Sequence, residues 1–237
     1  QPFGIYFNAA LDDASREIDN RWFHFSQMGG LVMGIDFDDL RVFSTIGEID
    51  ETILSVIARN PFRTEFHVEL THVEKLELLG GSRVLRRDRL KYYILEKDKP
   101  FPGARDDIRR LEKVDIDLVR NFYKSHYSGA IFSAWMLELP FWGLFVNQEL
   151  VAAGGAIVID RYGKAANIGN FLTSPKFRGN GYGKTIAKTL INDLMDDGVS
   201  IFTLGTTEEN ISAWKTYESV GFKLLERRVE IEFSSST

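Results

Sequence analysis

The chain contains no cysteine among its 237 residues. This absence excludes a disulfide framework, a thiolate metal site and any acyl-transfer mechanism that carries the acyl group on a cysteine sulfur. Histidine is scarce, and no two histidines have the three- or four-residue spacing that places both imidazoles on one helix face. The four are His24, His67, His72 and His126. We therefore expect no bound metal.

Long apolar runs and an excess of basic residues are also absent. No uninterrupted apolar stretch approaches the roughly 18 residues that cross a bilayer, and the first residues lack the charged-then-apolar pattern of a secretory signal. The formal net charge is -5 and the pI about 5.5, so no overall basic field attracts nucleic acid or anionic lipid. We expect a soluble, cytoplasmic protein with no nucleic-acid or membrane partner.

The composition is that of a folded protein, with 44% hydrophobic, 13% aromatic and 27% charged residues. The chain is long enough for one large domain or two small ones. Its sharpest interruption is residues 95–107, where two prolines, a glycine and a run of charges separate two apolar-patterned regions. This places a domain boundary near Gly103 and predicts an N-terminal α/β domain over 1–103 and a second domain over 104–237.

In the second half, apolar patterns predict three strands, then a helix, a strand, a helix and a closing strand. The strands span about 141–146, 150–159 and 165–172, and the later elements lie within about 176–198, 200–206, 210–222 and 223–233. Such a succession is typical of a mixed α/β fold in which helices cover a central mixed sheet.

The first half gives a weaker pattern of the same kind. It predicts helices near 11–23, 48–58 and 71–80 and strands near 31–43, 62–70 and 83–95. Residues 76–87 aligned on 217–228 match Glu77 to Glu218, Gly80 to Gly221 and the arginine pair 86–87 to the pair 227–228. This similarity indicates either an internal repeat or two helix-glycine-strand segments that are alike by chance.

The most informative segment is glycine-rich and lies between a predicted strand and a predicted helix. It consists of Arg178, Gly179, Asn180, Gly181, Tyr182, Gly183 and Lys184. Alternating glycines let the backbone approach a ligand closely, and the N–H groups and dipole of a helix N-terminus favour an anion. A phosphate group is therefore the expected occupant.

Two common phosphate motifs do not fit this segment. A nucleotide-triphosphate loop requires glycine at the position of Arg178, and a dinucleotide fingerprint requires glycine at the position of Lys184. The pattern R-x-x-G-x-G, from Arg178 to Gly183, instead resembles the pyrophosphate-binding motif of the GNAT acetyltransferases. A glycine-rich turn without a ligand is the alternative reading of this motif taken alone.

A second motif lies downstream on a predicted helix. Asn210, Ala213, Tyr217 and Gly221-Phe222 resemble the N-x-x-A-x-x-x-Y-x-x-x-G-F helix of the same family. At about 100° per residue, Asn210 and Tyr217 fall on one helix face about 10 Å apart along the axis, which suits an elongated ligand. The resemblance implies that Asn210 and Ala213 contact coenzyme A and that the Tyr217 hydroxyl reaches its sulfur.

The resemblance covers about residues 104–233 and extends to the strand before the glycine-rich segment. In the family that strand is splayed and offers backbone groups to the pantetheine arm, a role implied here for Asn170, Phe171, Leu172 and Thr173. The first half lacks a glycine-rich helix entrance, and Glu69 and Leu76 stand at the positions of the asparagine and tyrosine. A degenerate half beside an active half also resembles, in architecture, the glycine N-acyltransferase-like enzymes.

The resemblance implies an N-acetyltransferase that uses acetyl-CoA and a small-molecule or peptide amine. The amine attacks the thioester directly, a backbone N–H near Leu172 stabilises the oxyanion, and Tyr217, protonated at neutral pH, is the general acid. No general base is identified, with Glu138, His126 and Glu208 the available groups, and Phe132, Trp135 and Met136 belong to the acceptor region or to the core. Transfer of a longer acyl chain to an amino acid and a non-catalytic coenzyme A sensor are the alternative functions.

Overall fold

The computed structural model describes residues 22–27, 30–37, 40–59, 61–103, 107–127 and 131–235. The described residues divide between two compact units. The first comprises Gln1–Tyr92, Gly205–Ile211 and Leu224–Thr237, and the second comprises Tyr93–Leu204 and Ser212–Lys223. Each unit is mixed α/β, which confirms the fold class expected from the sequence. The domain boundary near Gly103 stays a prediction.

The first unit starts with three antiparallel strands and continues with a helix, a parallel strand and a second helix. Its elements are β1 (Trp22–Gln27), β2 (Gly30–Phe37), β3 (Leu40–Gly47), α2 (Glu51–Ala58), β4 (Arg63–Val68), α3 (Val73–Gly80) and the first part of β5 (Val84–Glu96). Most of the helix predicted over 11–23 lies outside the described residues, and its last two residues, Trp22 and Phe23, belong to strand β1 instead.

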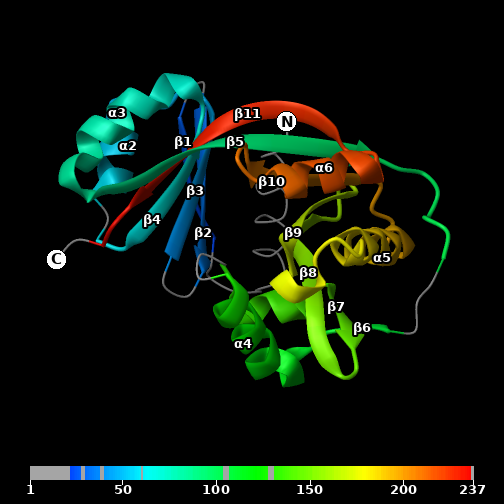
Figure 1. The fold of residues 1–237 in the computed structure, drawn as a ribbon. Coiled ribbons are helices and arrows are strands. Elements are labelled where there is room, and N and C mark those ends of the chain that lie inside the picture. The colour runs from blue at the N-terminus through cyan, green and yellow to red at the C-terminus, as the bar shows by residue number, and fades with distance from the viewer. Residues whose placement is uncertain are drawn as a thin grey trace. The chain divides into compact units, whose positions relative to one another are not determined.

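Helices α2 and α3 lie over one face of this sheet (Figure 1). Leu54 of α2 and Leu76 of α3 are fully buried against Phe66 of β4 and Ile231 of the last strand of the chain. Because side chains alternate between the two faces of a strand, Glu65 and His67, which flank Phe66, point to the opposite face.

The second unit begins with β6 (Ile108–Arg110) and α4 (Ile116–His126) and then has the same succession of elements as the first. These elements are β7 (Phe141–Val146), β8 (Glu149–Asp160), β9 (Ala165–Thr173), α5 (Tyr182–Asp196), the first part of β10 (Ile201–Thr207) and most of α6 (Ile211–Val220). Strands β7, β8 and β9 are antiparallel, α5 follows, β10 is parallel to β9, and α6 comes next. The order and pairing of elements from β1 to α3 thus recur from β7 to α6, whereas the internal repeat in the sequence stays a prediction.

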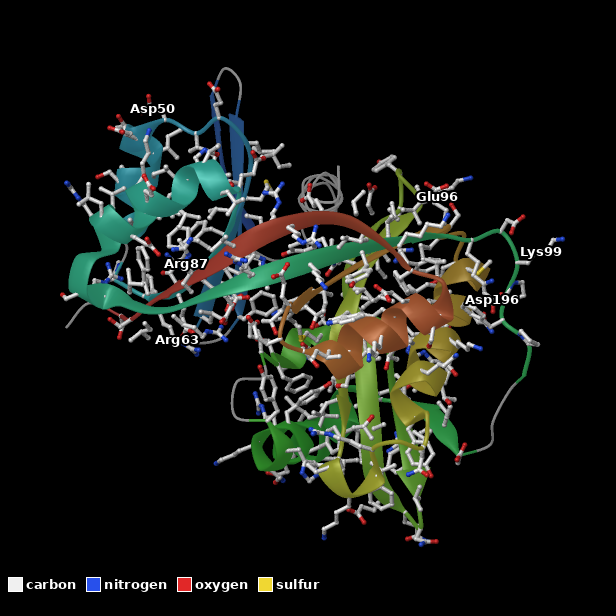
Figure 2. The ribbon with its side chains drawn as sticks, turned by 45° about the horizontal axis from the view of Figure 1, so that its top comes forward. Asp50, Arg63, Arg87, Glu96, Lys99 and Asp196 are labelled. Carbon is white, nitrogen blue, oxygen red and sulfur yellow. The ribbon has the colours of Figure 1, made fainter. Side chains whose placement is uncertain are left out.

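The core of the second unit lies between its sheet and helices α5 and α6. Leu190 and Leu194 of α5 and Phe202 of β10 are fully buried, and Tyr217 of α6 packs into the same cluster. The four-residue spacing of Leu190 and Leu194 places both on one helix face, as the apolar pattern predicted. Asp196 ends α5 at the surface, where Figure 2 labels it.

The last strand of each half pairs with the other half of the chain. Strand β11 (Lys223–Phe233) is antiparallel to β4, with Ile231 opposite Phe66, whereas β5, which ends the first half, lies beside β10. Within the second unit, Lys97 N–H donates to the carbonyl of Ser200 at 2.9 Å just beyond these two strands. Each unit thus contains a strand from both halves of the sequence.

No helix among the described residues combines the length and the apolar character that a bilayer crossing requires.

On the face of the first unit away from α2 and α3, a charged cluster joins β4, β5 and β11. His67 Nε2 lies 2.7 Å from Glu65 and 3.4 Å from Glu230, while His67 Nδ1 lies 2.8 Å from the Tyr92 hydroxyl. The guanidinium of Arg86 contacts both carboxylates. The ligand-type atoms of Glu65, His67 and Glu230 lie within 4.8 Å of one another, but these contacts already pair each carboxylate, so we interpret the group as an ion-pair network.

Burial acts to lower the pKa of His67, but its hydrogen bonds to Glu230 and Glu65 outweigh burial and raise the pKa to about 9. Burial raises the pKa of Glu65, whereas Glu230 has a lowered pKa because His67 and Arg86 oppose its desolvation. His67 is therefore protonated at neutral pH, and its Nε2 faces both carboxylates. A raised folded-state pKa contributes stability that is complete below the ordinary histidine pKa of about 6.5 and is lost as pH rises through about 9.

We expect His67→Gln to remove this pH dependence. Between about pH 7 and 9, the free energy of unfolding of the unchanged protein should fall about 1–3 kcal/mol more than that of the variant. Urea unfolding at a series of pH values measures the difference. His126→Gln, a half-buried histidine of the second unit, is the control and should keep the wild-type slope. Parallel slopes for His67→Gln and wild type would contradict the assignment.

Candidate functional site

Strands β9 and β10 pair only at their beginnings. The parallel register joins Ala165–Asn167 to Ile201–Thr203, and within these two fully described strands it goes no further. Asn167 closes the paired part, because its side-chain amide donates to the hydroxyl and the carbonyl of Thr203 at 3.1 and 3.3 Å. From Ile168 onward, the edge of β9 that faces β10 is therefore without its sheet partner.

A bulge interrupts β9 within this unpaired part. Opposite β8, Gly155 pairs with Gly169 and Ala153 with Leu172, so Asn170 and Phe171 together face one residue, Gly154. Asn170 has a left-handed backbone with φ of 54°, which asparagine tolerates better than most residues. A Cβ atom on Gly154 would lie 2.3 Å from the ring of Phe171, so this position requires glycine.

The side chain and carbonyl of Asn170 bind two other segments of the unit. Its amide nitrogen donates to the carbonyl of Ile131 at 2.6 Å and lies 3.4 Å from the sulfur of Met136. Its own carbonyl accepts a hydrogen bond from the hydroxyl of Tyr123 on α4. Tyr123 is buried, and burial raises its pKa above the ordinary tyrosine value, so this hydroxyl keeps its proton and donates.

The glycine-rich segment forms the entrance of helix α5. Gly179 and Gly181 have φ of 83° and 76°, and Gly181 is the N-cap residue, with no side chain capping the helix. The first backbone bond of the helix runs from Thr185 N–H to the carbonyl of Gly181 at 3.0 Å. The end of the helix that favours an anion is thus left without an acceptor from a capping side chain.

Side chains of the same segment hold its loop in place. Asn180 donates to the carbonyl of Phe177 at 3.0 Å, and Arg178 Nε donates to the carbonyl of Thr173 at 3.3 Å. A Cβ atom on Gly183 would meet the Thr173 hydroxyl at 3.5 Å, an ordinary contact. The predicted residues of β9 and of the glycine-rich segment are therefore neighbours in the structure. Tyr182 and Lys184 lie half-buried in the first turn of α5.

The corresponding helix of the first unit, α2, has the opposite kind of entrance. Its N-cap is Asp50, labelled in Figure 2, whose carboxylate accepts a hydrogen bond from Thr52 N–H at 2.7 Å. The side chain of Thr52 and, second, its backbone N–H both hydrogen-bond the Asp50 carboxylate, which lowers the pKa of Asp50 and keeps the side chain anionic. At the N-terminus of α2, where an anion would bind, the carboxylate of Asp50 already accepts a backbone hydrogen bond. No side chain does so at the N-terminus of α5.

Tyr217 lies buried on α6 among aromatic rings. Its ring centroid is 6.1 Å from Phe171, 6.3 Å from Tyr93 and 6.2 Å from Phe222. Its hydroxyl donates to no described residue, and burial raises its pKa above the ordinary tyrosine value. The site therefore holds a phenol that stays protonated at neutral pH, beside the bulge of β9.

The other two residues predicted on this helix differ in placement. Ala213 is one turn before Tyr217, half-buried and packed against the same core. Asn210 precedes the first residue of α6, is exposed and is grouped with the first unit, so its contact with coenzyme A stays a prediction.

The acidic and histidine residues considered as general bases have other neighbours. Glu138 pairs with Lys113 at 2.8 Å, Glu208 pairs with Arg227 at 3.0 Å, and the His126 ring packs on Phe122. Nothing in these contacts marks one of them as the base.

The region proposed for the acceptor contains both core and half-exposed side chains. Met136 is 1% exposed and belongs to the core, whereas Phe132 and Trp135 are half-buried, and Phe132 stacks on Tyr123 with centroids 5.6 Å apart. The hydroxyl of Ser133 is buried with no hydrogen-bond partner among the described residues. In native proteins such a hydroxyl usually binds a water molecule or a ligand.

Three residues that contact the predicted site were not predicted from the sequence, namely Tyr123, Tyr93 and Gly154. The paired glycines 154–155 within an apolar strand were an available signal, since glycine inside a strand often marks a close approach or a bulge. Nothing in the sequence links Tyr93, at the end of the first half, to Tyr217.

Comparison with known proteins agrees with this geometry. Residues 107–222 match the family model described as "Acetyltransferase (GNAT) family". Over 57 residues, 24% of the chain, the sequence is 39% identical to a [Ribosomal protein bS18]-alanine N-acetyltransferase of Haemophilus ducreyi, and the match spans only 39% of that enzyme.

Solved structures resemble the chain over almost its whole length. A GNAT-family acetyltransferase of Novosphingobium aromaticivorans superposes with a TM-score of 0.69 at 18% identity, covering 98% of this chain and 96% of that one. A Drosophila protein superposes with a TM-score of 0.74 at 12% sequence identity, covering 98% of this chain and 90% of that one. A GCN5-related N-acetyltransferase-like protein of Streptococcus suis superposes with a TM-score of 0.68 at 13% identity, covering 98% of this chain and 93% of that one. At these identities the likeness shows the fold alone.

The backbone conformations of Gly181 and Gly183 predict different effects of alanine on stability. Gly181→Ala forces a Cβ atom into a left-handed conformation and should lower the free energy of unfolding by about 1–2 kcal/mol. Gly183→Ala adds a methyl group in ordinary contact inside a helix and should leave stability equal or slightly higher. Urea unfolding compares the two variants, and an equal loss in both would contradict the described entrance.

Proposed function

We propose that the chain, whose residues 107–222 match the GNAT acetyltransferase family model, transfers an acetyl group from acetyl-CoA to a primary amine by direct attack. The observation that carries the proposal is the uncapped entrance of α5 next to the unpaired edge of β9. A helix N-terminus without its own acceptor suits a diphosphate, and an unpaired strand edge offers N–H and C=O groups to an amide-containing arm.

The residues present fit coenzyme A on chemical grounds. The backbone N–H groups of the first turn of α5 would hold the diphosphate, and the unpaired part of β9, Asn170 to Thr173, would bind the pantetheine arm. Arg178 and Lys184 add positive charge at the same entrance. When bound, the cofactor supplies an activated thioester carbonyl and a thiol leaving group.

Two groups of the chain would then act on developing charge. A backbone N–H near Leu172 would stabilise the oxyanion, and one fixed donor of this kind is typically worth about 3 kcal/mol in the transition state. Tyr217 would donate a hydrogen bond to the sulfur as negative charge forms on it. Its raised pKa keeps the proton in place at neutral pH and makes complete transfer to the sulfur unfavourable before bond breaking.

The path of the amine proton involves no residue of β9, because Ala165–Thr173 contains no carboxylate or histidine. We propose that the proton passes to water. Among acceptors, the Haemophilus relative acts on an alanine of a ribosomal protein, so the amines tested should include a peptide with an N-terminal alanine besides free amino acids and small amines.

The first experiment is a calorimetric titration with coenzyme A, followed by release of free thiol from acetyl-CoA in the presence of each amine. We expect saturable binding and amine-dependent thiol release. Binding without amine-dependent release would favour a coenzyme A sensor over an enzyme, and absence of binding would contradict the assignment of the α5 entrance.

Tyr217→Phe tests the hydrogen bond that the Tyr217 hydroxyl would donate to the sulfur. We expect kcat to fall about 100-fold while the affinity for coenzyme A changes little, because the hydroxyl acts on charge that forms only in the transition state. Tyr162→Phe, an exposed tyrosine of the same unit, is the matched control and should turn over normally. Wild-type kcat at saturating substrate in Tyr217→Phe would show that the assigned role is wrong.

A further inference from the structure

Asn170 contacts three separate parts of the second unit. Its backbone forms the bulge of β9, its carbonyl accepts from Tyr123 on α4, and its side-chain amide donates to Ile131 and reaches Met136. The next residue, Phe171, carries the ring that packs against Tyr217. One residue therefore links the segment 131–136 to the strand position beside the phenol.

The donor capacity of Asn170 is needed for this link. The carbonyl of Ile131 accepts at 2.6 Å from the amide nitrogen, and Ile131 lies outside every helix and strand, so no ladder bond fixes its position. An amide can supply this hydrogen, whereas a carboxylate of the same shape presents only acceptors. The left-handed φ of 54° adds a second requirement, which glycine, asparagine and aspartate meet best.

The segment that Asn170 holds has the features of a substrate-facing surface. Phe132 and Trp135 are half-buried, and the buried hydroxyl of Ser133 has no partner among the described residues. Phe132 stacks on Tyr123, the same residue whose hydroxyl binds the Asn170 carbonyl. Displacing Asn170 would therefore move both the backbone and one aromatic ring of the segment.

We infer that Asn170 is a positioning residue for the amine acceptor: its amide holds residues 131–136 against the bulge of β9, so that the acceptor surface keeps a fixed place relative to Phe171 and Tyr217. This inference rests on the proposed acyl transfer and adds that two parts of Asn170 act on different substrates. The backbone of Asn170 serves the cofactor side, and its side chain serves the acceptor side.

Asn170→Gly separates these two roles, because glycine keeps the left-handed backbone and removes the amide. With the amine that gives the highest turnover in wild type, we expect KM for the amine to rise about tenfold, the range of one lost hydrogen bond. KM for acetyl-CoA should stay within about threefold. Asn170→Asp should show at least the same rise in KM for the amine, because its carboxylate faces the carbonyl of Ile131.

Asn192→Ala is the matched control. Asn192 also holds a loop backbone in this unit, donating to the carbonyl of Phe101 at 2.9 Å and accepting from its N–H at 2.7 Å, and among the described residues its side chain forms no hydrogen bond to the site. We expect Asn192→Ala to be less stable than wild type and to keep the wild-type ratio of KM for the amine to KM for acetyl-CoA. If KM for the amine rises similarly in Asn192→Ala and Asn170→Gly, the effect of Asn170→Gly is explained by lower stability of the protein, and the inference is overturned.

Hydrogen exchange followed by mass spectrometry gives a readout without turnover. In Asn170→Gly, peptides covering 131–140 should exchange faster by about tenfold, while peptides of α5 keep wild-type rates. Unchanged exchange over 131–140 would overturn the inference even if the enzyme is active. If no amine is acetylated by the wild-type protein, the proposed function fails, but faster exchange would still establish the structural link.

Discussion

Beyond Asn167 and Thr203, strands β9 and β10 no longer pair, and the candidate site depends on this separation. An unpaired strand edge inside a protein leaves N–H and C=O groups that need partners, so it is stable only where a ligand or water supplies them. The bulge at Asn170 lies in the same stretch and directs Phe171 toward Tyr217. The unpaired part of β9, which carries Asn170 and Phe171, begins where this pairing stops after three residues of each strand.

The two helix entrances show that one topology can have a helix N-terminus with or without a capping side chain. In α2 the carboxylate of Asp50 caps the helix, which stabilises the N-terminus and occupies the place of an external anion. In α5 the N-cap is Gly181, which provides the left-handed backbone but no acceptor side chain. The sequence indicated a missing glycine-rich entrance in the first half, and the structure adds that a side chain fills the anion position there.

Much of the second unit was predictable because its signals are local. Apolar spacing at Leu190 and Leu194 and glycines at 179 and 181 specify a helix and its entrance within a few residues, and both were predicted. The partners of β5 and β11 were not, because an alternating strand pattern records which face is buried and not which strand lies alongside. The environment of Tyr217 was missed for the same reason, since Tyr93 reaches it from the end of the first half.

The exchanged last strands also constrain the order in which the chain can become structured. The first unit includes Leu224–Thr237, so the edge of β4 that faces β11 lacks this partner until residues 229–233 have been synthesised. Proteins usually complete N-terminal domains during translation, while the rest is still being made. Neither half of the chain therefore completes its own unit, and this edge of β4 gains its strand partner only when residues of the second half are present.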